Sequence, residues 1–154
     1  MKPRLAVICF LAIITAAASL DAGSVQQQVI GEAGYFFKAL NSQDYGKAFN
    51  CLSKRLRIYY SFHEFKFRAQ RVHYAKILGF KITESYEKLV RLTASAKLQL
   101  WYEGELYNAV YRGKVNLVKE GGAWKLDSCQ LDPIGTAKPV SGKGIEKPGI
   151  IFEL

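Results

Sequence analysis

The fold is decided by residues 89–118, which read LVRLTASAKLQLWYEGELYNAVYRGKVNLV. Over residues 90–100, apolar and polar side chains alternate without a break. This alternation is typical of a strand that buries one face and leaves the other in water. Glu103-Gly104 marks a turn, and a similar alternation returns over residues 107–117. The stretch therefore predicts a long antiparallel hairpin.

Two further strands are predicted on either side of this hairpin. Gly121-Gly122 makes the next turn, and residues 124–131 return as a last strand. Residues 77–87 form the strand before the hairpin. Its expected inward side chains are Leu78, Phe80 and Ile82. Hairpin strands of about 13 residues exceed the usual five or six, so the sheet is expected to bend.

Helices are predicted before the strands. Apolar residues recur every three or four positions over residues 25–41, and a shorter helix is expected over residues 44–52. Residues 53–57 are expected to form a basic linker. Ser61 stands three residues before Glu64, which is the spacing of a capping box, and predicts a third helix from Phe62 to about His73.

These elements predict an α+β domain in which three N-terminal helices pack on the concave face of a curved four-stranded antiparallel sheet. The chain has 154 residues, of which 49% are hydrophobic, and this suits one globular domain. We expect the domain to span residues 23–133. Residues 134–154 form a tail rich in Gly, Pro and Lys. Its apolar end, residues 150–152, is a candidate edge strand or partner-binding segment, with disorder as the alternative.

The first 22 residues have the three parts of a secretory signal peptide: a cationic start, the apolar run of residues 5–18, and small residues before a polar stretch. Cleavage after Ala22 is favoured over cleavage after Ala18. The alternative is a retained membrane anchor, but 14 apolar residues make only about 21 Å of helix, short of a hydrocarbon core of about 30 Å. The protein is therefore expected to be exported, as a periplasmic or secreted protein. Cleavage after Ala22 removes two cations and one acid, which lowers the net charge from +9 to +8.

Two cysteines, Cys51 and Cys129, remain after this cleavage. In an oxidising compartment they are a candidate disulfide, which would stabilise the fold by up to about 4 kcal/mol. The alternative is two buried free thiols.

Four segments resemble the nuclear-transport-factor-like superfamily of α+β cones, also called cystatin-like. They are Tyr35–Asn41 followed by Asp44–Ala48, the hairpin Leu89–Val118, and the closing Gly121–Leu126. The resemblance covers residues 25–133 and implies an exported bacterial member of that superfamily. Its members include small-ligand binders, lyases, isomerases and non-enzymatic assembly components. No catalytic residue of any of them can be carried over to this chain, so the resemblance bears on the fold rather than on the function.

A basic segment lies between Lys54 and Lys81, where eight cations face the single acid Glu64. Aromatic residues are interleaved with these cations, a mixture that suits recognition of anions. Export argues against nucleic acid and leaves an envelope protein or an anionic surface, either lipid headgroups or a cell-wall polymer, as the partner. The ordinary alternative is a solvated cationic face above core aromatics. The candidate residues for the anionic partner are Arg55, Arg57, Lys66, Arg68 and Arg71 in this segment and Arg91, Lys97, Arg112 and Lys114 on the outer sheet face.

The inner sheet face carries small side chains that either leave a cavity for a small hydrophobic ligand or let a helix approach closely. The candidate cavity residues are Phe36, Phe37, Ala94, Ala96, Tyr107 and Tyr111. On the outer face, like charges would repel a second copy, which favours an acidic partner over a homodimer there.

Catalytic and metal motifs are absent from the sequence. His63 and His73 do not share a helical face, and no His-x-x-x-His or Cys-x-x-Cys spacing occurs. No metal, cofactor or catalytic residue is therefore predicted. Two functions remain: a non-catalytic binding or assembly module of the bacterial envelope that contacts an anionic partner, and a small-molecule binder or lyase-like enzyme that uses the cone cavity.

Overall fold

The computed structural model describes residues 4–140 and 152–154, with side chains described for residues 23–140 and 154. Four helices precede the strands: α1 (Arg4–Asn41), α2 (Tyr45–Asn50), α3 (Lys54–Tyr59) and α4 (Phe62–Ala69). The strands are β1 (Val72–Ser85), β2 (Leu89–Tyr102), β3 (Glu105–Glu120), β4 (Ala123–Pro133), β5 (Lys138–Pro139) and β6 (Phe152–Glu153). The predicted α+β class and helix-then-strand order are confirmed.

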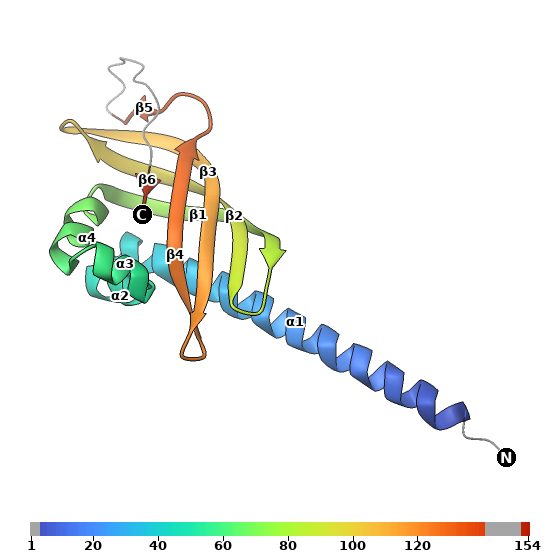
Figure 1. Ribbon diagram of the computed structural model, residues 1–154. Coiled ribbons are helices and arrows are strands. Elements are labelled where there is room, and N and C mark those ends of the chain that lie inside the picture. Colours follow the sequence, from blue (N-terminus) through green and yellow to red (C-terminus); the bar gives the residue numbers. More distant parts are fainter. Residues whose placement is uncertain (1–3, 141–151) are drawn as a thin grey trace.

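The sheet arches over one part of α1, and α2, α3 and α4 gather at the end of that helix (Figure 1). Its strands follow the order β1-β2-β3-β4-β6, and β5 pairs with β3. All of these pairings are antiparallel. Register shifts interrupt the β1–β2 pairing at three points and the β3–β4 pairing at one. Such bulges bend strands, which accounts for the curvature that the long strands predict.

The concave face of the sheet and the buried side of α1 share one core. Phe36, Phe37 and Leu40 of α1 are at most 2% exposed. The apolar residues of β2 from Val90 to Leu100 are buried as the alternation predicts. Burial of this apolar stripe, rather than helix propensity, fixes α1 against the sheet.

The N-terminal region departs from the prediction in two places. The residues expected to form a basic linker instead include α3, which begins after the N-cap residue Ser53, whose hydroxyl accepts a hydrogen bond from Leu56 N at 3.2 Å. The first helix also begins well before Val25, at Arg4. Across the described part of the chain, no helix combines the length and apolarity needed to span a membrane.

The boundary between α4 and β1 also differs. The capping box is present: Ser61 Oγ accepts from Glu64 N at 3.2 Å, and Glu64 accepts from Ser61 N at 2.8 Å. The helix ends at Ala69 instead of His73, and β1 begins at Val72. Leu78, expected to point inward, is 53% exposed, because the bulge between Ile77 and Gly79 changes the face on which it lies.

The predicted tail contributes β5 and β6 to the sheet edges. Of its apolar end, Phe152 belongs to β6, while Ile150 and Ile151 lie outside the described residues. Most of the predicted signal peptide, from Arg4 onward, continues α1 as helix.

Candidate functional site

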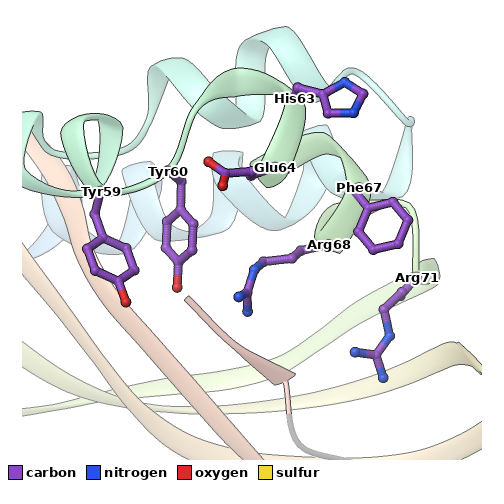
Figure 2. Close-up of a pocket in the computed structure, with 7 residues that line it drawn as sticks. All are labelled: Tyr59, Tyr60, His63, Glu64, Phe67, Arg68 and Arg71. Carbon is purple, nitrogen blue, oxygen red and sulfur yellow. The ribbon is translucent and has the colours of Figure 1, made fainter.

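A groove of about 740 Å³ runs along α3 and α4 and ends where α4 passes into β1. Figure 2 shows Tyr59, Tyr60, Arg68 and Arg71 pointing to one side of this helix pair, and His63 farther from Tyr59 and Tyr60. The lining residues are Tyr59, Tyr60, His63, Glu64, Phe67, Arg68 and Arg71. We call this the α3–α4 groove.

The helix pair is held to the sheet by a polar brace around Asp127 of β4. The buried Ser53 hydroxyl lies 2.6 Å from Asp127 Oδ1, and Arg55 Nε lies 3.0 Å from the same oxygen. Arg55 also donates to the main-chain oxygen of Asp127. Leu56 and Phe65 bury the inner sides of α3 and α4. Arg55, predicted to contact a partner, is therefore held against β4 by its contacts with Asp127, while its side chain remains 63% exposed.

Several large apolar side chains on α3 and α4 face solvent. Ile58 is 85% exposed, Tyr59 73%, Phe67 70% and Phe62 45%. Lone exposed apolar residues are ordinary, but a cluster of this size marks an interaction surface. Phe62 packs edge-to-face on Phe49 and Tyr59 on Tyr60, at ring-centroid distances of 5.5 and 4.8 Å. The larger part of the Ile58, Tyr59 and Phe67 side chains nevertheless faces solvent.

Cations lie beside the exposed apolar side chains. The Arg68 guanidinium stacks over the Tyr60 ring at 4.9 Å, and Arg71 lies 5.8 Å from the Tyr102 ring. In the described residues no carboxylate forms an ion pair with either arginine. A ring quadrupole orients a cation without neutralising it, so both keep their full charge. The exposed Arg57 and Lys66 add to it.

Glu64 is the acid of the groove, but its carboxylate is engaged by the helix end. Hydrogen bonds from the main chain and side chain of Ser61 hold the pKa of Glu64 below its ordinary value. The carboxylate therefore stays ionised in its cap, which leaves the groove cationic overall.

The remaining predicted cations lie on a separate surface, the outer face of the sheet. Arg91 pairs with Glu84 at 2.5 Å, and Arg112 donates to Ser95 Oγ at 3.4 Å. Lys97 and Lys114 are exposed on β2 and β3. The nine predicted cations thus divide into two sets, and the structure does not bring them together into one site.

All six candidate cavity residues lie in the core. Phe36, Phe37, Ala94, Ala96, Tyr107 and Tyr111 are at most 2% exposed and belong to one packed cluster. The Tyr107 hydroxyl donates to Glu105 at 2.7 Å. The Tyr111 hydroxyl is buried and has no hydrogen-bond partner among the described residues, and burial raises the pKa of Tyr111 to about 12. This arrangement supports the interpretation that small residues such as Ala94 and Ala96 let α1 pack closely on the sheet.

The two cysteines are both buried free thiols. Leu126 N donates to Cys51 O at 2.8 Å, while Cys129 lies three residues further along β4. Three residues of strand span about 10 Å, more than the Cα separation of about 7 Å that a disulfide tolerates. The candidate disulfide is therefore not formed in the structure. Burial raises the pKa of both thiols to about 12.

Sequence reasoning missed three side chains near the groove. Ile58 follows the segment 53–57 that was expected to be a linker and was assigned to no element, and Trp101 and Tyr102 come from the end of β2. Arg71 Nε lies 3.4 Å from Trp101 O, which fixes that end of the groove. The available signal was the break in alternation at Trp101 and Tyr102, where two large aromatic residues follow each other. In the described part of the chain, no three His, Cys, Asp or Glu side chains gather as a metal site.

Comparisons with known proteins agree on the fold. No protein-family model matches the sequence, and neither does any curated protein. A proposed dehydratase of the nuclear-transport-factor-like family from Streptomyces avermitilis has a solved structure with a TM-score of 0.52 and 9% identity, over 68% of this chain and 92% of that one. An Asp-to-Asn variant of a protein of unknown function from Mycobacterium tuberculosis gives a TM-score of 0.50 and 12% identity, over 70% of each chain.

These likenesses define the class of fold. The chain has the nuclear-transport-factor-like α+β cone, with helices packed against a strongly curled antiparallel sheet. The predicted resemblance is confirmed at the level of the fold. At such low identity it carries no activity.

Proposed function

We propose that this protein is a non-catalytic binding module that docks through the α3–α4 groove onto an anionic phospholipid surface of the bacterial envelope. The observation that carries the proposal is the combination, on one pair of helices, of exposed Ile58, Tyr59 and Phe67 with Arg68 and Arg71, neither of which forms an ion pair with a described carboxylate. The predicted signal peptide supports an envelope location.

A lipid surface uses both halves of this combination. Anionic headgroups attract nearby cations by about 1 kcal/mol each, and the attraction fades within a Debye length. Aromatic side chains with a polar tip favour the headgroup level, and aliphatic ones favour the acyl boundary. A soluble polyanion would need only the cations and would leave Ile58 and Phe67 in water.

The electrostatic half is tested by charge reversal. The Arg68→Glu/Arg71→Glu variant is measured for binding to phosphatidylglycerol-containing vesicles, with phosphatidylcholine vesicles as the baseline. Loss of two headgroup attractions should weaken binding by at least about 2 kcal/mol, or about 30-fold. Protein is purified after export to a bacterial periplasm, and its intact mass shows whether residues 1–22 are present.

The matched control is Lys97→Glu/Lys114→Glu, which changes the net charge equally on the outer sheet face. It should change vesicle binding by only a few-fold. Equal losses in both variants would mean that net charge, not the α3–α4 groove, controls binding, and would contradict the proposal.

The apolar half is tested at a salt concentration that screens the cations. Phe67→Ser should lower the remaining vesicle binding, because the 70%-exposed ring is then missing from the interface. Leu78→Ser is the control, since Leu78 is 53% exposed on β1, away from the groove. If Phe67→Ser binds vesicles as the wild type does while the charge reversal fails, the partner is a soluble polyanion or an acidic protein.

A second candidate function is a small-molecule binder or lyase-like enzyme that uses the cone interior. The buried Tyr111 hydroxyl without a partner is the observation in its favour, because such a group would gain from a ligand's polar atom. The neighbour from Streptomyces avermitilis is a proposed dehydratase, which fits this alternative. Non-denaturing mass spectrometry tests it: a bound species of a few hundred daltons that disappears in Tyr111→Phe would support it, and a bare chain would count against it.

A further inference from the structure

The outer edge of β4 is closed in two places by other parts of the chain. Near Leu126 the cover is the junction of α2 and α3, through Ser53 N to Leu126 O at 2.8 Å and Leu126 N to Cys51 O at 2.8 Å. Further along, the cover is β6 with Leu154. A sheet edge without such a cover presents unpaired main-chain groups to other chains.

The second cover has a simple basis. Cys129 N donates to Leu154 O at 3.1 Å, and Leu154 N donates to Cys129 O at 2.8 Å. The register continues as Gln130 with Glu153 and Leu131 with Phe152. The Leu154 side chain is only 7% exposed and belongs to the core cluster. Main-chain pairing and one buried leucine are therefore the described contacts of this segment.

The main-chain pairing and the burial of Leu154 can both form when residues Phe152–Leu154 come from another molecule. Main-chain hydrogen bonds do not depend on which copy supplies the strand, and exchange of an identical element creates no new interface to be optimised. In the described part of the chain, the segment that fits the β4 edge from Cys129 to Leu131 is this chain's own residues Phe152–Leu154. These two facts select a second copy as the occupant.

We propose that the β4 edge from Cys129 to Leu131 is an interaction surface for residues Phe152–Leu154 of a second copy, so that copies assemble by strand exchange. A covalent tether holds a copy's own strand at an effective concentration in the millimolar range, so exchange is rare in dilute solution. Figures 1 and 2 place β6 beside α3 and α4, next to the groove. Copies docked side by side through that groove would be concentrated with their exchangeable strands near one another, which would favour assembly on the surface.

Cys129 provides a direct test in solution, independent of any vesicle. Residues that exchange both main-chain bonds have Cα atoms about 5.5 Å apart, which a disulfide accepts. All chains carry Cys9→Ala and Cys51→Ala. A donor chain adds Leu154→Cys and Cys129→Ser, and an acceptor chain keeps Cys129 and Leu154. Donor and acceptor are mixed, oxidised slowly, digested and searched by mass spectrometry for a link between position 154 and Cys129.

This link can form only between copies, and we expect its yield to rise with protein concentration. Random collision is measured with an acceptor that carries Cys129→Ser and Leu78→Cys, whose thiol is exposed on β1. Exchange predicts that the buried Cys129 links faster than this exposed thiol. The proposal is overturned if mixing gives no link to Cys129 at any concentration, or a slower one than the exposed control, while a single chain with both thiols links to itself. Since no lipid is present in this experiment, its failure would leave the proposal of docking to a lipid surface standing. Failure of the vesicle-binding experiments would likewise leave the strand-exchange proposal standing.

Discussion

Replacing Gly113 with alanine should force β3 and β4 apart at the centre of the sheet. Gly113 pairs with Leu131. A Cβ at this position would overlap the carbonyl oxygen of Gln130 and lie 2.8 Å from Leu131 Cα. The obstacle is main chain rather than a flexible side chain, so the strands themselves must separate.

The size of the effect follows from what that separation breaks. About two main-chain hydrogen bonds in total, those that flank the pair, would be lost at about 1 kcal/mol each, and overpacking adds about 1–3 kcal/mol. The expected loss in the free energy of unfolding is about 3–5 kcal/mol, a large part of the roughly 5–15 kcal/mol that a domain has. With a urea slope of about 2 kcal/mol/M, the unfolding midpoint should fall by about 2 M.

The assay is urea unfolding followed by tryptophan fluorescence, because Trp124 is buried in the core. Gly79→Ala is the matched control: Gly79 lies in β1, and a Cβ there meets nothing within 4 Å. Its unfolding free energy should change by at most about 1 kcal/mol. An unfolding midpoint for Gly113→Ala within error of the wild type would refute the close approach of β3 and β4.

Three further predictions concern the brace, the cap and the thiols. Asp127→Ala removes the acceptor of the buried Ser53 hydroxyl and the partner of Arg55, and should lower the free energy of unfolding by about 1–3 kcal/mol in urea titrations. Ser61→Ala removes one half of the capping box and should cost about 1 kcal/mol in the same assay. The pKa of Glu64 is lowered in the folded state, so the contribution of the ionised cap to stability is complete above the ordinary carboxyl pKa of 4.5 and is lost as the pH falls through the lower folded pKa. In this pH range the free energy of unfolding should therefore fall faster for the wild type than for Glu64→Gln. Equal falls in the two proteins would contradict this role of Glu64. Since burial raises the pKa of Cys51 and Cys129 to about 12, both thiols should react with a disulfide reagent at pH 8 far more slowly in the native chain than in urea, and rapid labelling of the native protein would show that the core is open.

Most of the sheet could be predicted because its strands have one wet face. The alternation over residues 90–100 fixes which side chains point inward, and the structure buries them. Leu78 shows the limit of this reasoning: a bulge adds one residue to a strand and reverses the faces beyond it. The local sequence pattern of β1 does not predict where its register with β2 shifts.

The helix α3 could not be predicted from its own residues. Six residues give too few turns for a periodic pattern, and so short a helix is unstable alone. Its stability comes from Asp127, which lies more than seventy residues later and binds both Ser53 and Arg55. The same distance in sequence explains why the contacts of Arg55 with Asp127 were not predicted.

The candidate site was predicted in composition but not in geometry. The basic segment contains both Phe65 and Phe67, and the structure buries the first completely while leaving the second 70% exposed. Two residues apart on a helix, they point to different sides, so the sequence contains this distinction only once the helix boundaries are known. Trp101 and Tyr102 approach Arg71 through the sheet, a tertiary contact that no local pattern reports.

The way each cation is held separates the two basic surfaces as docking sites. On the outer sheet face, Arg91 is paired with a carboxylate, so an incoming anion must replace an existing ion pair. In the α3–α4 groove, Arg68 lies over an aromatic ring, which fixes its direction and leaves its charge available. The inner face of the cone offers neither arrangement, because Phe36, Phe37 and Tyr111 fill it with packed side chains. These differences are the reason for our proposal that an anionic surface docks at α3 and α4, where Ile58 and Phe67 would also gain from leaving water.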